Sequence, residues 1–98
     1  MYYEKTRKLI DELGEKYRIA VFNTMGNKYP CIPENIVIFP LTKESDFSTF
    51  VGSIAQSGHF DIFIFDKITN LHPSYMMLHS KLEFLSDLAK KYNLTIFT

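Results

Sequence analysis

An aspartate at the end of an apolar run, Asp66, is the residue whose position most suggests chemistry. The stretch FDIFIFDKITNL, residues 60–71, sets four apolar residues between two aspartates and continues into polar Thr69 and Asn70. A carboxylate at the end of a buried strand can hold magnesium through water, or it can cap the following turn by accepting backbone amides. The turn-capping interpretation is favoured, because most aspartates at strand ends serve turns.

Other chemically capable residues show no sign of acting together. Cys31 lies between two prolines in a loop, without a sequence sign of a paired base, so we do not expect a nucleophile. His59, His72 and His79 share no spacing typical of a metal site, and we expect no metal or other cofactor. The stretch HPSYMMLH, residues 72–79, offers an adaptable contact surface, although core packing is the favoured interpretation.

Composition restricts the classes of function. A chain of 98 residues is expected to form one domain, residues 1–98. Eleven lysines and arginines balance eleven aspartates and glutamates, so no basic field attracts nucleic acid. The single cysteine and the lack of a signal-peptide pattern predict a cytoplasmic protein. No apolar run approaches the roughly 20 residues of a membrane-spanning helix, so we expect no membrane association.

Apolar patterning predicts helices that alternate with strands. Strands that are apolar throughout, rather than at every second residue, are typical of a parallel sheet covered on both faces. We therefore predict an α/β fold, a three-layer α/β/α sandwich with a four-stranded, mostly parallel sheet. Helices are expected over 4–17, from a Ser45 cap to Gly58, and from Pro73 to Asn93. Tyr17 is expected on the apolar stripe of the first helix and Leu82 on that of the last. Strands are expected over 18–23, 36–40, 60–66 and 94–98.

The carboxyl ends of the predicted strands mark the place to look for a site. In parallel sheets, the loops that follow these ends form the ligand crevice. The polar and turn residues expected there are Asn23, Thr24, Pro40, Thr42, Asp66, Lys67 and Thr98.

Four segments, taken in order, resemble the core of RecA-like P-loop ATPases, particularly the archaeal RadA and KaiC-type branch. Residues 4–27 are similar to the helix that begins Gly-Lys-Thr and the strand that ends Asp-Thr-Glu-Gly. Residues 34–47 resemble the next strand and helix start, 60–71 the Walker B strand, and 81–98 the long helix and the strand that leads to Asn-Gln. The resemblance implies the strand order 2-1-3-4.

The sequence departs from the family where the family's chemistry resides. Lys5 and Thr6 match the last two positions of the phosphate-binding loop, but Glu4 replaces the final glycine and would repel phosphate. Met25 stands in place of the catalytic glutamate, and a thioether cannot polarise water. Asp66 alone matches the metal-holding chemistry. We expect Lys5 and Thr6 to be solvated on the first helical turn rather than bound to an anion.

These departures favour a non-enzymatic protein-interaction module derived from a RecA-like ATPase. One alternative is a small nucleotide- or phosphate-binding regulator that uses the crevice around Asp66, with Thr24, Thr42 and Lys67. Another is an accessory protein of DNA recombination or repair, which the neutral charge opposes.

The resemblance also predicts a partner. Only three residues precede Glu4, so the family's P-loop strand is expected to be missing and the outer side of strand 94–98 to be bare. We expect two copies to pair there antiparallel as a homodimer through Leu94, Ile96 and Phe97, with a full-length RecA-like ATPase as a further partner. The competing possibility is that the first helix, with Tyr2 and Tyr3, folds over this edge.

Overall fold

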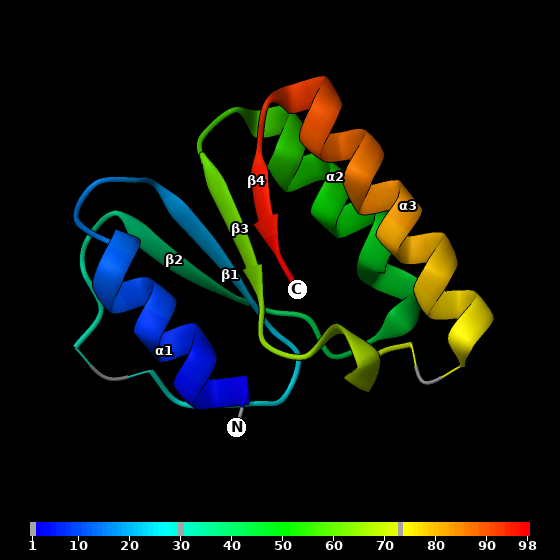
Figure 1. Ribbon diagram of the computed structural model, residues 1–98, viewed down its shortest axis with the longest axis horizontal. Helices are drawn as coiled ribbons and strands as arrows, with labels where there is room; N and C mark the ends of the chain where they lie inside the picture. The colour runs from blue at the N-terminus through cyan, green and yellow to red at the C-terminus, as the bar shows by residue number, and fades with distance from the viewer. Residues whose placement is uncertain (1, 30, 73) are drawn as a thin grey trace.

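A four-stranded parallel sheet forms the centre of the molecule, with α1 on one face and α2 and α3 on the other (Figure 1). The computed structural model describes residues 2–29, 31–72 and 74–98, with the side chains of Tyr2 and Tyr3 outside the description. The elements are α1 (Tyr2–Leu13), β1 (Ile19–Asn23), β2 (Ile36–Pro40), the 3-10 turn η1 (Glu44–Asp46), α2 (Phe47–Ser57), β3 (Ile62–Phe65), the 3-10 turn η2 (Ile68–Asn70), α3 (Tyr75–Tyr92) and β4 (Thr95–Phe97).

The sheet order is β2-β1-β3-β4 and every pairing is parallel, which confirms the predicted α/β fold and strand order. The chain steps from β1 to β2 in one direction and then crosses back over β1 to reach β3. Right-handed connections in opposite directions lie on opposite faces. The loop after β1 accordingly packs with α1 through Tyr29 and Ile32, whereas α2 and α3 cover the other face. The order in which strands are added to the sheet therefore reverses between β1 and β3, and the gap between the carboxyl ends of these two strands is the reversal point.

The two faces of the sheet differ in the type of side chain they carry. Successive residues of a strand point to opposite faces, and in β1 and β3 the branched aliphatic residues alternate with alanine or phenylalanine. The first set packs with Ile10 of α1, and the second with Phe47 of α2. On the aromatic face, the rings of Phe22 and Phe65 are stacked with centroids 4.7 Å apart. Burial on both faces explains why these strands are apolar from Ile19 to Phe22 and from Ile62 to Phe65.

Helix boundaries differ from the predicted ones at α1 and α2. α1 ends at Leu13 rather than at residue 17, because the chain turns sharply at Gly14, where a Cβ atom would lie 2.5 Å from the Ile10 carbonyl oxygen. Tyr17, expected on the buried stripe, lies beyond the helix and is 42% exposed. Ser45 lies within η1 and does not cap α2, whose N-cap residue Asp46 makes no side-chain capping bond.

α2 and α3 end at the two residues predicted to stop them, Gly58 and Asn93. Gly58 and Asn93 close these helices in the left-handed conformation, with φ of 71° and 56°. At the start of α3, the Ser74 hydroxyl accepts a hydrogen bond from the Met77 amide. The buried face of α3 differs from the predicted one at Leu82, which is 37% exposed.

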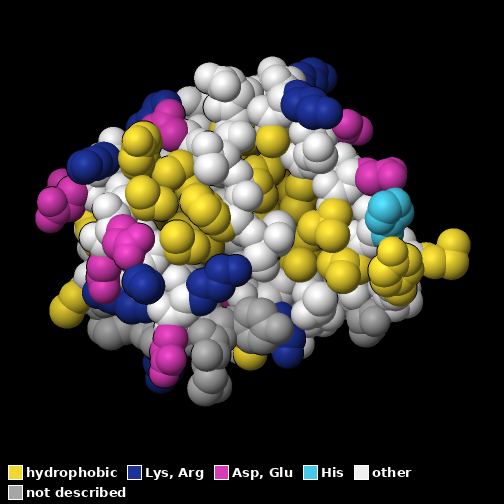
Figure 2. Space-filling model, viewed as in Figure 1, with side chains coloured by type: hydrophobic (Ala, Val, Ile, Leu, Met, Phe, Trp, Pro, Cys, Tyr) yellow, Lys and Arg dark blue, Asp and Glu magenta, His cyan; other side chains and the backbone are white. Residues whose placement is uncertain are grey.

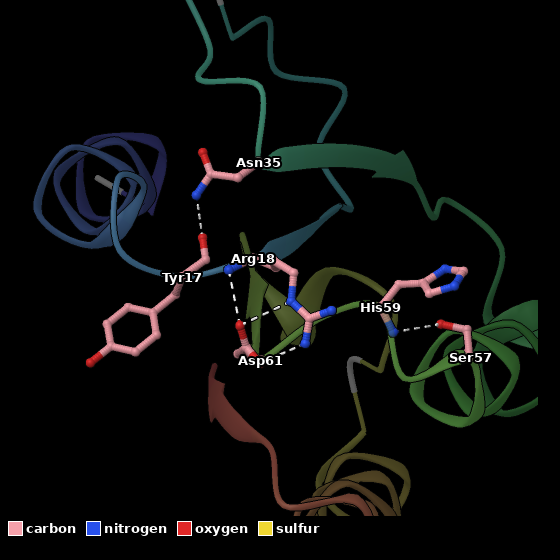
Figure 3. A network of polar contacts seen from close by, with 6 residues as sticks. All are labelled: Tyr17, Arg18, Asn35, Ser57, His59 and Asp61. Atoms are coloured by element: carbon pink, nitrogen blue, oxygen red, sulfur yellow. Dashed lines mark hydrogen bonds and ion pairs between the residues drawn. The ribbon is translucent and has the colours of Figure 1, made fainter.

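An ion pair holds the amino ends of β1 and β3 together (Figure 3). The Arg18 guanidinium lies 3.0 Å from Asp61 Oδ1, and the Arg18 backbone amide donates to Asp61 Oδ2 at 3.1 Å. Hydrogen bonds from Arg18 lower the pKa of the Asp61 carboxyl. Both side chains are about half exposed, so the pair contributes little to stability.

The position of β3 inside the sheet leads to a prediction about stability. Phe63 is fully buried, and its replacement by alanine should lower the free energy of unfolding by about 3–5 kcal/mol, because a cavity is left behind. Urea unfolding followed by circular dichroism measures this loss, with Met76→Ala, at a side chain 81% exposed, as the matched control. A loss as small as the control's would show that β3 does not carry the core.

Candidate functional site

The carboxyl ends of β1 and β3 meet at the reversal point of the sheet, and the carboxylate of Asp66 is buried there at 2% exposure. It accepts hydrogen bonds from Asn27 Nδ2 at 3.2 Å and from the Tyr29 hydroxyl, both on the loop after β1. The Thr6 hydroxyl of α1 also hydrogen-bonds to it. Within the described part of the chain, the donors are therefore side chains from other segments, whereas a turn cap would use backbone amides.

The carboxylate of Asp66 is held by uncharged donors alone. Burial raises the pKa of Asp66, while the hydrogen bonds from Tyr29, Asn27 and Thr6 act in the opposite direction. Burial, and then the neighbouring carboxylate, also raise the pKa of the Tyr29 hydroxyl, which therefore stays a proton donor at neutral pH. Among the described residues, no lysine or arginine contributes to the shift at Asp66.

The neighbouring polar residues tie the two loops of the crevice to each other. The Thr24 hydroxyl donates to the Lys67 carbonyl oxygen at 2.9 Å and accepts from the Lys67 amide at 3.3 Å. The Asn70 side chain donates to the Thr24 carbonyl oxygen at 2.7 Å. Asn23 and Asn27 exchange two further hydrogen bonds within the first loop. The side chains of Asn23 and Thr24, predicted to face a ligand, thus bond to the loops of the crevice itself.

The remaining predicted residues are divided between this crevice and other places. Thr6 was expected to be solvated, which is wrong, because α1 places it at 2% exposure against Asp66. Lys5 is exposed, and so is Met25 in the turn after β1. Thr42 lies apart from Asp66 in a hollow between the end of β2 and the start of α2, together with Lys43 and Asp46.

Sequence reasoning missed Asn27, Tyr29 and His72, and nothing in their spacing points to them. His72 is fully buried, and neither ring nitrogen has a hydrogen-bond partner among the described residues. Its ring meets the Phe47 ring edge to face at 4.7 Å, with Glu44 Oε1 4.0 Å from Nδ1. Burial lowers the pKa of His72, so its contribution to stability is present above about pH 6.5 and is lost on acidification.

A second candidate site lies at the open edge of β4, which among the described residues pairs only with β3. The Thr95 amide donates to the Asp61 carbonyl oxygen at 3.2 Å. Alternate residues of a strand direct their backbone groups to the same side, so Thr95 faces β3 and the N–H and C=O of Ile96 point outward. These outward groups are the usual binding points for an added strand.

Grooves run along both sides of this edge. The groove beside α3 is apolar and includes Leu82, Leu85, Ala89 and Ile96. The groove beside α1 is mixed, with Leu13, Tyr17 and Phe97 next to the polar residues Asp61, Asn93 and Thr95. Figure 2 shows hydrophobic side chains gathered in the middle of the face where Figure 1 has β4 between α1 and α3.

The predicted edge residues belong partly to the core. Leu94 and Ile96 pack against the cluster under α2 and α3, and Phe97 packs against the cluster under α1. Tyr75 and Met76, at the start of α3, are each 81% exposed, so the core interpretation of residues 72–79 is wrong for both. Exposed apolar side chains therefore extend from the β4 edge to the start of α3.

No protein-family model matches the chain, and neither does any curated protein sequence. Within residues 2–29, 31–72 and 74–98, no helix is long and apolar enough to span a membrane. The same residues contain no group of three or more His, Cys, Asp or Glu side chains that could bind a metal ion. Function is therefore argued from the two sites themselves.

The hydrogen bond between Tyr29 and Asp66 leads to a pH-dependent prediction. Tyr29→Phe should destabilise the fold by about 1–3 kcal/mol at neutral pH, because a buried carboxylate loses a donor. The loss should shrink as the pH is lowered through the raised pKa of Asp66, since the protonated carboxyl depends less on that donor. Urea unfolding across this pH range tests it, with Tyr75→Phe at an exposed position as the control. A loss independent of pH would show that Tyr29 acts only through packing.

Proposed function

We propose that the protein is a non-enzymatic protein-interaction module that joins another chain through the open edge of β4. The observation that carries this is the outward N–H and C=O of Ile96, set between two grooves, of which the one beside α3 is apolar. An incoming strand can bond to these groups while its side chains enter the grooves. Natural edge strands are usually protected by proline or an inward charge, and the sequence of β4, Thr-Ile-Phe, has neither.

The partner proposed first is a second copy of the chain. Two β4 strands related by a twofold axis can pair antiparallel, which closes the assembly at a dimer with one continuous sheet. A full-length RecA-like ATPase is the other candidate partner, because a related core would offer a similar sheet edge. We place this activity in the cytoplasm, where a protein with the single cysteine Cys31 remains reduced.

A RecA-like origin forms part of the proposal. The strand order agrees with the one that the resemblance implies. Thr6 and Asp66, far apart in sequence, are hydrogen-bonded. They match the two positions that hold magnesium in P-loop ATPases.

The crevice supports an interaction module better than a nucleotide-binding regulator. A magnesium ion bound at Asp66 would displace Tyr29 and Asn27 from the carboxylate and uncover a buried group. The Thr24 hydroxyl is bonded to the Lys67 backbone, and Thr42 is not beside it. A role in DNA repair has less support, because eleven basic residues are balanced by eleven acidic ones.

Self-association should depend on the outward N–H of Ile96. Sedimentation velocity over a hundredfold concentration range should show a monomer–dimer equilibrium, and Ile96→Pro should weaken it by about tenfold or more, because proline cannot donate to an incoming strand. The bonds to β3 use Thr95 and are retained. Ile96→Val keeps the N–H and is the matched control, with circular dichroism to verify folding. A wild-type monomer at every concentration overturns the homodimer.

Nucleotide should leave the protein unchanged. A ligand at about 100 times its Kd would stabilise the fold by about 2.7 kcal/mol. We expect no shift in Tm with magnesium and ATP, or with single-stranded DNA, relative to buffer, because the Asp66 carboxylate already has its donors. ATP turnover that disappears in Asp66→Ala would favour the nucleotide-binding regulator instead.

A further inference from the structure

We infer that α3 of one copy packs antiparallel against α3 of the second copy, across a twofold axis that passes beside Ser86. The inference rests on the proposed function, because it takes the pairing of β4 with β4 as its starting point. α3 packs beside β4, and the groove between them is lined by Leu82, Leu85, Ser86, Ala89, Ile96 and Thr98. Any strand added to β4 therefore brings its own helix next to this groove.

The spacing of strands and helices fits such a contact. Paired strands lie about 4.8 Å apart, so two helices, each lying over an edge strand and its inner neighbour, come within about 10 Å of each other. That separation is close to the distance at which helices pack, about 8–10 Å. The sheet and the helix layer would both continue across the axis.

The position of the axis follows from Ile96. Its N–H and C=O both point outward, so an antiparallel pair centred there exchanges two hydrogen bonds between the two Ile96 residues. The helix residues that share a groove with Ile96 run from Leu82 to Ala89, and Ser86 lies near their midpoint. The axis through the strand pair therefore passes beside Ser86.

A stripe of α3 faces the open edge and suits this contact. Tyr75, His79, Leu82, Ser86, Ala89 and Asn93 recur at intervals of four and three residues and lie on one side of the helix. Tyr75 and Leu82 are apolar and exposed, at 81% and 37%. Ser86 and Ala89 are small, which lets two helices approach closely. A second α3 would cover Leu82, which lies near the axis, whereas Tyr75 extends beyond the overlap of the two helices.

Charges beside the stripe are complementary under twofold symmetry. Glu83 lies one turn before Ser86, and Lys90 lies one turn after it. In an antiparallel pair centred on Ser86, Glu83 of each copy faces Lys90 of the other, so two opposite-charge contacts form and no like charges meet there. Glu83 already lies 3.1 Å from His79 of its own helix, which directs its carboxylate along the stripe. This self-complementarity selects a second copy as the occupant.

A cysteine on the axis provides the direct test. With Cys31→Ser as the background, Ser86→Cys should form a covalent dimer on mild oxidation, because a residue beside a twofold axis faces its own copy within disulfide reach. Ser80→Cys, about a third of a turn around α3 from Ser86 and outside the stripe, is the matched control and should remain monomeric on a denaturing gel. Equal cross-linking of the two variants overturns the packing of α3 on α3.

Charge reversal gives an independent readout. Glu83→Lys should raise the dimer Kd by about tenfold, and adding Lys90→Glu should restore it to within about threefold of wild type. Asp87→Lys with Lys91→Glu makes the same changes outside the stripe and should leave the Kd unchanged. A dimer that is sensitive to Ile96→Pro but shows neither Ser86 cross-linking nor charge rescue overturns this inference and leaves the proposed function standing. A wild-type monomer overturns both.

Discussion

The burial of β1 and β3 on both faces is the constraint on which the rest of the structure depends. Neither strand exposes a side chain to water, so every position before Asn23 in β1 and every position in β3 is apolar, and each face needs its own helix layer. Right-handed connections then oblige the chain to reverse direction between these two strands. The crevice, the placement of α1 and the exposed edge at β4 all follow from that reversal.

A polar network fills the reversal point and gives this crevice a structural role. In open parallel sheets the gap at such a point usually admits a ligand. Here the loop after β1 turns inward, so that Asn27 and Tyr29 supply hydrogen bonds to the buried Asp66. A carboxylate at this depth is costly unless its oxygen atoms have donors. The network therefore stabilises the join between the loops that follow β1 and β3.

The two edges of the sheet differ in a way that bears on function. β2 ends in Pro40 and carries an exposed Val37. β4 lies between α1 and α3 with a groove on each side. Its neighbouring helix continues the same surface through Leu82 and Tyr75. Backbone bonding at the strand and side-chain packing at the helix would thus act together in one interface.

Local patterns in the sequence determined the strands, the parallel sheet and the helix stops at Gly58 and Asn93. Apolar periodicity, and residues that readily adopt the left-handed backbone conformation, determine structure over only a few neighbouring positions. Only the tertiary structure decided what surrounds Asp66. Asn27 is 39 residues away from it, and a contact over such a separation leaves no local signature. Periodicity likewise assigns a face to a helix without saying how far the sheet beneath it extends. Thr6 is buried because α1 lies over the crevice, whereas Leu82 is exposed because the sheet ends at β4.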